Sequence, residues 1–368
     1  MRPTMKRYRW AAVASGICLL ASACGSGAAS SAGGGGTTAV DSSGGGSGDV
    51  DPIITAYQGP KVDLSGVSLT VTSSEPDGLT MGELFMFGKL KQWGANVDHV
   101  VLTSTSGIQT MVAGKSDLAA QGADEVVLGN AQGAHVTAIG SPDSKQHYVL
   151  VAKKSVKDVK ALSGKSIAMS GPSGFDTLLS KYALHQAGMQ PNAAKFVQIG
   201  GSPDRAAALL SGTVDAATIF LAGWENLQTK SDKLHLLKNF AQTTDFPGDV
   251  YYAKADYLKA NPKLALGVAC ANLEANDWLR NNEDQYVKFA LKKVQGSDEA
   301  SLKQIWQDAI SAKMWPSDPA DILPGQGLKD LQQAMLISGE INKASDLSEA
   351  TDDSYLQKAA DMGCGSQH

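Results

Sequence analysis

The sequence predicts an α/β protein built from two similar lobes with a cleft between them. This prediction rests on an internal repeat of about a hundred residues. Segment 64–69 (LSGVSL) recurs as 162–167 (LSGKSI), and segment 111–117 (MVAGKSD) recurs as 209–215 (LLSGTVD). Such a period is too long for a solenoid unit, which usually has about 20–50 residues, so each copy is predicted to be a small α/β layer with its own core.

Both copies predict the same order of elements, namely strand, helix, strand, helix and strand. The expected strands are short runs rich in small and β-branched residues, which fit buried parallel strands. They are 67–72, 99–102 and one beginning at Asp117 in the first copy, and 166–169, 196–199 and one beginning at Asp215 in the second. The first helices are predicted to end at Gly94 and Gly188, because glycine suits the left-handed residue just after a helix. In an open parallel sheet the loops after the strands share one edge, where ligands usually bind.

Segments outside the repeats predict how the lobes are joined. Residues 147–152 lead into the second copy and residues 249–253 follow it. Both are expected to be strands that cross between the lobes and form a hinge. The rest of the chain is predicted to be helical and to cover the back of the first lobe. The expected helices are 257–260, 262–280, 284–294, 299–312 and 327–338.

The first 24 residues predict export. Four basic residues precede an apolar run at 10–23, which is too short for a stable membrane span. The residues around Cys24 resemble a bacterial lipoprotein signal, residues 1–23, in which Cys24 becomes the acylated first residue, although Ala21 stands where that family prefers a large aliphatic side chain. The alternative is an ordinary secretory signal cut near Ala23. Residues 24–60 are then the acylated cysteine and a flexible Gly/Ser tether, which holds the body at the outer face of the cell membrane.

Charge and cysteine content narrow the class of partner. Without residues 1–23 the chain has 28 Lys and Arg against 37 Asp and Glu, and this acidic balance argues against nucleic acid. Cys18 lies inside the signal. The two cysteines of the body, Cys270 and Cys364, form either one disulfide or two free thiols. Neither a cofactor nor a metal is expected, since the six histidines show no ligand spacing.

Three features carry a resemblance to a known family. They are the lipoprotein-like signal with its tether, the paired segments 113–120 and 211–218, and the segment 251–262 (YYAKADYLKANP). With these, the chain resembles the solute-binding proteins of ABC importers, in particular the group that binds sulfonates, nitrate and pyrimidine precursors of thiamine. The resemblance implies a type II periplasmic-binding-protein-like fold that closes at a hinge, a small-molecule ligand, and a permease and ATPase complex as partner. We expect a monomer.

The candidate ligand-binding residues lie in the loops at the strand ends of both lobes. Lobe 1 is predicted to comprise residues 61–148 and 253–368, and lobe 2 residues 149–252. Small hydroxyl residues and glycines at helix starts expose backbone N–H groups that hold a ligand or, more often, only cap the helix. The functional interpretation therefore depends on their meeting at one edge. The candidates are Ser73, Ser74, Thr103, Ser104, Thr105, Gly122, Asp124, Ser170, Ser173, Gly174, Gly201, Ser202, Phe220 and Trp224.

Side-chain chemistry favours a nitrogen heterocycle or vitamin precursor as the ligand. Trp224 follows Ala222 and Gly223 and is predicted to lie in a loop, where it would stack on a planar ligand, whereas Phe220 ends a strand and suits a core role better. Nearby acidic residues favour a ligand with an amine or N–H group. They are Glu75, Asp77, Asp124, Glu125, Asp176, Glu225 and Asp245. The mature body has only two arginines, and Arg205 is expected at the surface, so a sulfonate-like or nitrate-like anion is the second choice.

Other functions on the same fold are weighed against this one. Some pyrimidine-forming enzymes share the fold, but they resemble it with an added site rich in cysteine and histidine, which this chain does not show. A chorismate-dehydratase-like activity is not excluded by any motif, but an export signal argues against a biosynthetic role in the cytoplasm. A sensor or adaptor without a permease is the remaining alternative. The sequence therefore predicts a receptor that is not an enzyme.

Overall fold

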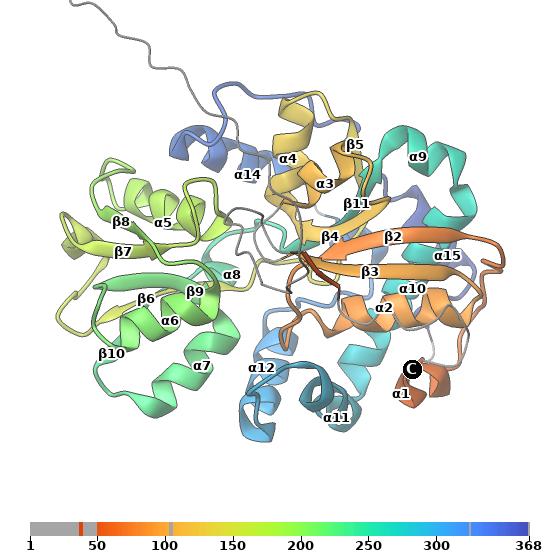
Figure 1. Ribbon diagram of the computed structural model, residues 1–368, viewed down its shortest axis with the longest axis horizontal. Coiled ribbons are helices and arrows are strands. Elements are labelled where there is room, and N and C mark those ends of the chain that lie inside the picture. The colour runs from red at the N-terminus through yellow and green to blue at the C-terminus, as the bar shows by residue number, and fades with distance from the viewer. Residues whose placement is uncertain (1–36, 40–49, 103–105, 324, 367–368) are drawn as a thin grey trace, which may run out of the picture. The chain divides into compact units, whose positions relative to one another are not determined.

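Two mixed β-sheets form the centre of the fold (Figure 1). The computed structural model describes residues 37–39, 50–102, 106–323 and 325–366. The strands are β1 (Thr37–Ala39), β2 (Ser68–Ser73), β3 (Asn96–Leu102), β4 (Leu118–Gly122), β5 (Val136–Gly140), β6 (Tyr148–Lys153), β7 (Ser166–Met169), β8 (Lys195–Gln198), β9 (Ala216–Phe220), β10 (Leu234–Asn239) and β11 (Asp249–Lys254). Within the described residues, one sheet has the order β1-β3-β2-β4-β11-β5 and the other has the order β10-β6-β9-β7-β8. The first sheet with its helices is called the first lobe here, and the second sheet with its helices the second lobe.

The sequence repeat is a repeat of strand pairing. In the first sheet β2 pairs in parallel with β3 and β4, and in the second sheet β7 pairs in parallel with β8 and β9. The repeated glycines have the expected backbone, since Gly94 has a φ of 100° and Gly188 a φ of 78°, both in the left-handed region. The prediction of an α/β fold with two lobes is therefore confirmed.

Each sheet is completed by a strand from outside its own copy of the repeat. Strand β11 pairs antiparallel with both β4 and β5, and β6 pairs antiparallel with both β9 and β10. Each of these strands lies wholly within one sheet. The chain therefore passes between the lobes just before them, through residues 141–147, the first crossing, and residues 240–248, the second crossing.

Helices cover both sheets and form most of the C-terminal third. The four longest helices predicted after residue 260 match α10, α11, α12 and α14 to within two residues at each end. The helices are α1 (Pro52–Ala56), α2 (Met81–Gln92), α3 (Gly107–Val112), α4 (Ala123–Ala131), the 3₁₀ helix η1 (Val159–Leu162), α5 (Phe175–Gln186), α6 (Ser202–Leu210), α7 (Leu221–Lys230), α8 (Phe240–Thr243), α9 (Ala255–Ala260), α10 (Pro262–Asn281), α11 (Glu283–Lys293), α12 (Glu299–Ser311), α13 (Pro319–Ile322), α14 (Gly325–Ser338) and α15 (Ser354–Asp361).

The C-terminal helices contact both lobes, not the first lobe alone. Helix α12 packs against α7, and α14 packs against α4 on one side and α5 on the other (Figure 1). Lys181 of α5 forms an ion pair with Glu340, just after α14, at an N–O distance of 3.2 Å. The segment that the sequence placed behind one lobe therefore also holds the second lobe.

Helix α10 anchors the first lobe. It packs between α2, α15 and β5, and most of its residues are buried. A disulfide joins Cys270 of α10 to Cys364 after α15, with the two Cα atoms 5.3 Å apart. Lys89 of α2 and Glu274 of α10 form a buried ion pair with an N–O distance of 2.9 Å. The end of the chain is thus attached covalently to the helix at the centre of this lobe.

The packed body begins near residue 50, earlier than the predicted start at residue 61. Ile54 of α1 is buried, and the Tyr57 hydroxyl donates a hydrogen bond to Asp277 Oδ2 at 2.8 Å. The predicted signal, Cys24 and most of the tether lie outside the described residues. Among the described residues, no helix combines the length and apolar character that a membrane crossing needs.

Candidate functional site

Several of the described candidate residues lie at strand ends, as expected, whereas Asp124 and Trp224 lie in helices. Ser73 ends β2, Gly122 ends β4 and Phe220 ends β9. Ser73 is buried, lies 2.8 Å from His99 Nε2 and donates to the Ser74 carbonyl at 2.9 Å. Its hydroxyl is therefore bound within the protein. Ser74 is partly exposed. Candidates 103–105 lie outside the described residues.

Three of the second-lobe candidates, Gly174, Gly201 and Phe220, are helix N-caps. Gly174 and Gly201 are the N-caps of α5 and α6, and Ser173 is exposed. Ser170 bonds to Asp176 through both its N–H and its hydroxyl. Ser202 Oγ accepts the Phe220 N–H at 2.9 Å. These groups shape the edge of the second sheet, but their hydrogen bonds are largely used inside the protein.

Arg205 is buried, so its predicted surface position is wrong. Its Nε donates to the Thr218 carbonyl at 2.9 Å, and its guanidinium pairs with Asp176, with Nε 3.5 Å from Oδ2. The other arginine of the body, Arg280, donates to the Trp315 carbonyl at 2.9 Å. Burial raises the pKa of Asp176 although Arg205 acts in the opposite direction. Both guanidinium groups therefore have structural partners.

Phe220 and Trp224 have the opposite environments from those predicted. Trp224 lies in α7, not in a loop, is only 9% exposed and packs in the core of the second lobe. Phe220 is partly exposed at the end of β9. The reason is that α7 begins at Leu221, directly after the strand, so Gly223 lies inside a helix and does not open a loop.

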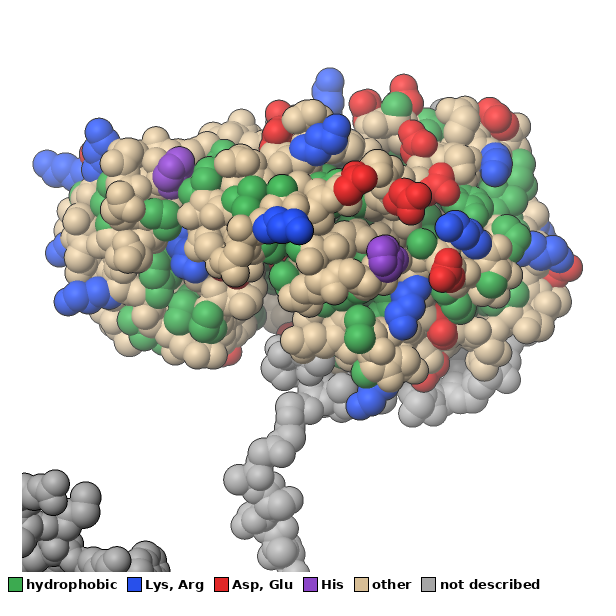
Figure 2. All heavy atoms as spheres, turned by 90° about the horizontal axis from the view of Figure 1, so that it is seen from above, with side chains coloured by type: hydrophobic (Ala, Val, Ile, Leu, Met, Phe, Trp, Pro, Cys, Tyr) green, Lys and Arg blue, Asp and Glu red, His purple; other side chains and the backbone are tan. Residues whose placement is uncertain are grey.

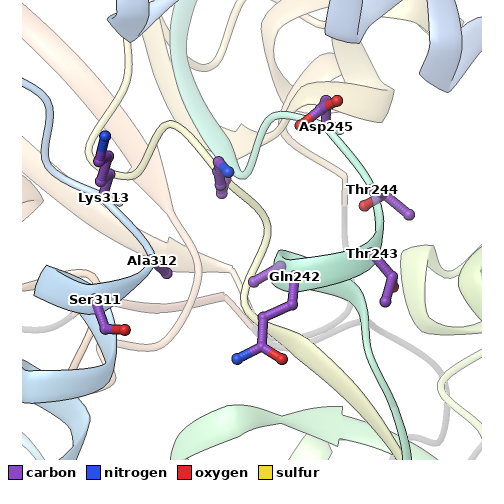
Figure 3. Close-up of a pocket in the computed structure, with 9 residues that line it drawn as sticks. Gln242, Thr243, Thr244, Asp245, Ser311, Ala312 and Lys313 are labelled. Carbon is purple, nitrogen blue, oxygen red and sulfur yellow. The ribbon is translucent and has the colours of Figure 1, made fainter.

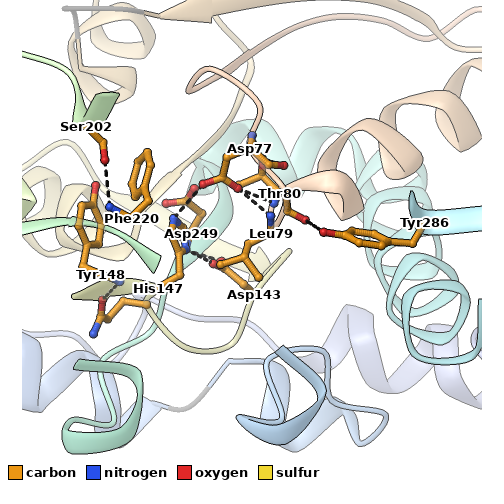
Figure 4. Close-up of polar contacts among 12 residues, drawn as sticks. Asp77, Leu79, Thr80, Asp143, His147, Tyr148, Ser202, Phe220, Asp249 and Tyr286 are labelled. Carbon is orange, nitrogen blue, oxygen red and sulfur yellow. Dashed lines mark hydrogen bonds and ion pairs between the residues drawn. The ribbon is translucent and has the colours of Figure 1, made fainter. Parts of the chain in front are cut away.

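An aromatic wall stands at the start of the second lobe. We use this name for His147, Tyr148 and Phe220, which are labelled in Figure 4, together with Phe175. The His147 and Tyr148 rings are stacked at 5.5 Å with an interplanar angle of 10°. Phe220 lies 4.8 Å from Tyr148 and 4.9 Å from His147, and Phe175 contacts Tyr148 edge-on at 5.7 Å, between ring centroids. His147 and Tyr148 were not among the predicted site residues, because both lie in a segment that was predicted only as a crossing strand.

Two carboxylates of the first lobe lie close together. A β-carbon placed on Gly122 would be 2.3 Å from Asp124 Oδ1 and 3.9 Å from Asp249 Oδ1. Burial, and then Glu125, raises the pKa of Asp124 well above its usual range. Burial, and then Asp143, raises the pKa of Asp249 to about 7. Asp143 accepts the Asp249 N–H at 2.7 Å, and its other oxygen lies 2.7 Å from His147 Nδ1, so this acid pair lies near the aromatic wall.

His147 is held between two further carboxylates (Figure 4). Its Nδ1 lies 2.7 Å from Asp143 Oδ2, and its Nε2 lies 3.6 Å from Asp77 Oδ2. Burial alone would lower the pKa of His147, but Asp77 and Asp143 raise it to about 9. The imidazole is therefore protonated at neutral pH, and both ring nitrogens carry a hydrogen.

The sequence of residues 91–285, more than half of the chain, matches the family described as NMT1/THI5 like. The chain belongs to the NMT1/THI5-like family. No curated protein matches its sequence.

Solved structures similar to this NMT1/THI5-like protein include periplasmic binding proteins. The periplasmic sulfonate-binding protein of Methylobacillus flagellatus KT is 17% identical, with a TM-score of 0.62 over 83% of this chain and 97% of that chain. The periplasmic nitrate-binding protein of Synechocystis PCC 6803 is 14% identical, with a TM-score of 0.64 over 80% of this chain and 89% of that chain. The periplasmic aliphatic sulphonate-binding protein of Escherichia coli is 18% identical, with a TM-score of 0.61 over 78% of this chain and 92% of that chain. The NMT1/THI5-like chain therefore has the periplasmic binding protein fold.

A separate cavity of about 440 Å³ lies beside the two crossings of the NMT1/THI5-like protein (Figure 3). It is lined by Lys145 of the first crossing, residues 241–245 of the second crossing and residues 311–313 at the end of α12. None of the candidate residues lines it. Because most of its lining side chains are exposed, it lacks the desolvated polar groups that mark the aromatic wall and the acid pair.

The ionisable side chains in the described part of the NMT1/THI5-like protein form no metal centre. Among those residues, no three or more His, Cys, Asp and Glu side chains are placed to hold a metal ion. On the face seen in Figure 2, basic and acidic side chains are interspersed, without one continuous basic tract. The chemistry available at the candidate site is therefore ring stacking, hydrogen bonding and charge.

Proposed function

We propose that this protein is the extracytoplasmic solute-binding component of an ABC importer. Its ligand would contact strand-end loops of both lobes and favour the closed arrangement, because only that arrangement offers both sets of contacts. The shared fold with sulfonate-binding and nitrate-binding periplasmic proteins supports this proposal. The closed receptor would then dock on a permease and ATPase complex.

We propose a neutral or cationic nitrogen heterocycle, such as a vitamin precursor, as the ligand. The observation that carries this proposal is the aromatic wall of the second lobe beside the acid pair Asp124 and Asp249 of the first lobe. A planar ring would stack on Tyr148 or Phe220, and its N–H or amino groups would donate to a carboxylate. In a desolvated site such charge-assisted hydrogen bonds are stronger than neutral ones.

An anionic ligand is the second candidate, favoured by the sulfonate- and nitrate-binding proteins of the same fold. An anion would have to be held by backbone N–H groups at helix starts, because Arg205 and Arg280 are bound to protein groups. It would also lie near carboxylates, which repel it. For these reasons the heterocycle is preferred.

The attachment and division of the molecule are part of the proposal. Acylation of Cys24 would anchor a monomer to the outer face of the membrane, with the segment up to about residue 50 as the tether. The two lobes would correspond to the predicted residues 61–148 with 253–368, and 149–252, with the boundaries moved to the crossings, because β6 from Tyr148 lies in the second sheet and β11 from Asp249 lies in the first. The rotation would occur in the two crossings. Mass spectrometry of the membrane-extracted protein would detect the acyl chains on Cys24.

The test is a thermal-shift screen of the purified protein against 4-aminopyrimidines and other vitamin precursors, aliphatic amines, alkanesulfonates and nitrate. A specific ligand at a hundred times its Kd stabilises the protein by about 2.7 kcal/mol, which shifts the Tm by several degrees. A hit among heterocycles or amines supports the proposed ligand. A hit among sulfonates or nitrate alone keeps the receptor and replaces the ligand class. Turnover of any hit, followed by NMR, would identify a same-fold enzyme instead.

A further inference from the structure

The first crossing is attached to the first lobe. Ser141 N–H donates to Asn272 Oδ1 of α10 at 2.8 Å. The Ser141 hydroxyl lies within hydrogen-bonding distance of the carbonyl oxygens of Asp143 and Asp249, at 2.7 and 2.6 Å. Asp143 itself is completely buried. Its position therefore follows the first lobe.

His147 is attached to the second lobe. Its carbonyl accepts the Leu221 N–H at the start of α7 at 2.8 Å. Its ring packs against Tyr148 and Phe220, as described for the aromatic wall. The imidazole therefore moves with the second lobe, while the two carboxylates that hold it, Asp77 and Asp143, belong to the first lobe and its crossing.

The second crossing returns to the same carboxylate. Asp143 Oδ1 accepts the Asp249 N–H at 2.7 Å, and Gly248 O accepts the Ala123 N–H of α4 at 3.0 Å. A β-carbon on Gly248 would lie 2.5 Å from Asp143 Oδ1, so only glycine permits this close approach. One buried carboxylate thus binds the Asp249 N–H, at the start of β11 directly after the second crossing, with one oxygen and His147 with the other.

We propose that Asp143 is a positioning residue for ligand capture, and that the Asp143–His147 contact is an ionic latch that sets the aromatic wall of the second lobe against the acid pair of the first. The latch rests on the proposed function, because it places the two halves of the proposed site. Opening of the lobes must break or stretch this contact, since its two partners are fixed to different lobes. A ligand that touches Tyr148 and Asp249 together would therefore favour the latched state.

The charged groups around the latch come from every neighbouring segment. Asp77 comes from the loop after β2, Glu83 from α2, and Asp249 from β11. Burial, followed by Asp249, Asp143 and Asp77, raises the pKa of Glu83 well above its usual range, and its Oε1 has no hydrogen-bond partner among the described residues. The raised pKa favours the neutral form of Glu83, and the carboxyl groups that act on the His147 imidazole are Asp77, Asp143 and Asp249.

The latch is tested in the ligand-free protein with two different changes. Asp143→Asn keeps the shape of the side chain and removes its charge. Gly248→Ala keeps the Asp143 charge but fills the space in which the Asp143 carboxylate approaches the backbone of residue 248. Asp215→Asn and Gly223→Ala are the matched controls: Asp215 accepts the Ser166 N–H within the second lobe, and a β-carbon on Gly223 meets only Ile219 Cδ1 at 3.8 Å. The readouts are the NMR titration of His147 and hydrogen exchange of the Asp249 and Gln146 amides, both of which bond at the crossings.

Both test variants are expected to lower the pKa of His147 from about 9 by about one unit or more and to speed exchange of the crossing amides, while amides within each sheet keep their rates. His99, bonded to Ser73 within the first lobe, serves as an internal reference whose titration should not move. An unchanged His147 titration in both folded variants overturns the latch. So does exchange that rises equally in all amides, which indicates a general loss of stability. The test uses no ligand, so its result can be interpreted even if the solute screen finds no ligand.

Discussion

The two lobes share a strand pairing but present different chemistry at the edge where they face the candidate site. The first lobe contributes carboxylates whose pKa values are raised by burial, above all Asp124 and Asp249. The second lobe contributes rings, and its one buried carboxylate there, Asp176, is paired with Arg205. The repeated topology therefore supplies equivalent positions in the two lobes, whereas the proposed recognition is divided between carboxyl groups in one lobe and aromatic rings in the other.

The largest expected effect on stability distinguishes a core residue of the second lobe, Trp224, from a proposed site residue, Phe220. Trp224→Ala should lower the free energy of unfolding by about 3–5 kcal/mol, because Trp224 fills the core of this lobe. Phe220→Ala should cost clearly less, because Phe220 is partly exposed. Urea unfolding measures both variants, and affinity for the ligand found in the screen completes the comparison. If Trp224→Ala left stability unchanged and abolished binding, the assignment of the two residues would have to be reversed.

The disulfide should stabilise the first lobe and leave the second lobe nearly untouched. Cys270 and Cys364 are 94 residues apart, and removing a native bridge typically costs about 2–5 kcal/mol. A Cys270→Ser/Cys364→Ser double variant should therefore lose protection from hydrogen exchange in α10 and α15, while β7 and β9 keep theirs. Equal loss in both sheets would show that the lobes unfold as one unit.

The acid pair should determine both the affinity and its pH dependence. Asp124→Asn should weaken binding of a cationic heterocycle by about tenfold or more, with Asp256→Asn on exposed α9 as the control. In the wild type, binding should tighten as the pH rises through about 7, because Asp249 loses its proton there and becomes the better acceptor. Calorimetry between pH 6 and pH 8 measures this trend. Affinity that falls over the same range favours an anionic ligand.

The smallest expected effect concerns a second place where the lobes meet, between α7 and α12. Burial, and then the charge of Asp308, raises the pKa of Glu225 to about 6. The carboxylate form is therefore disfavoured in the folded protein, and this cost appears as the pH rises from about 4.5 through 6. Because Glu225 is half exposed and screened, Glu225→Gln should add less than about 1 kcal/mol of stability at pH 7.5 and nothing at pH 4. Thermal unfolding at both pH values checks this, with Glu299→Gln as an exposed control.

The sequence was sufficient to predict the architecture because the repeat contains local signals for where its helices and strands begin and end. The glycines that end helices, the short β-branched runs and the apolar periodicity after residue 260 all depend on local physics, and each predicted its element. The environment of a side chain does not depend on local physics in the same way. Arg205 was expected at the surface, but it is buried because Asp176 and the Thr218 carbonyl lie beside it in the folded chain.

The sequence predicted a candidate site at the strand ends, but it did not predict the aromatic rings or the raised pKa values on which the proposed ligand depends. Strand-end loops were expected to meet, and Ser73, Gly122 and Phe220 do lie at strand ends. His147 and Tyr148 were missed because a crossing strand has no pattern that indicates which rings face the other lobe. The raised pKa values of Asp124 and Asp249 could not be predicted from the sequence either, since they depend on burial in the folded protein and on charges more than a hundred residues away, Asp249 for Asp124 and Asp143 for Asp249. Proximity to a crossing is the signal that would have found His147.

The connectivity of β11 also sets an order for synthesis. Strand β5 is complete at Gly140, but within the described sheet its partner is β11, which ends at Lys254. A ribosome adds about 5–20 residues per second, so β4 and β5 wait on the order of ten seconds for the strand that joins them. During that time two sheet edges of the first lobe lack their partner. A nascent chain therefore cannot complete its first sheet until the strands of the second sheet have been synthesised.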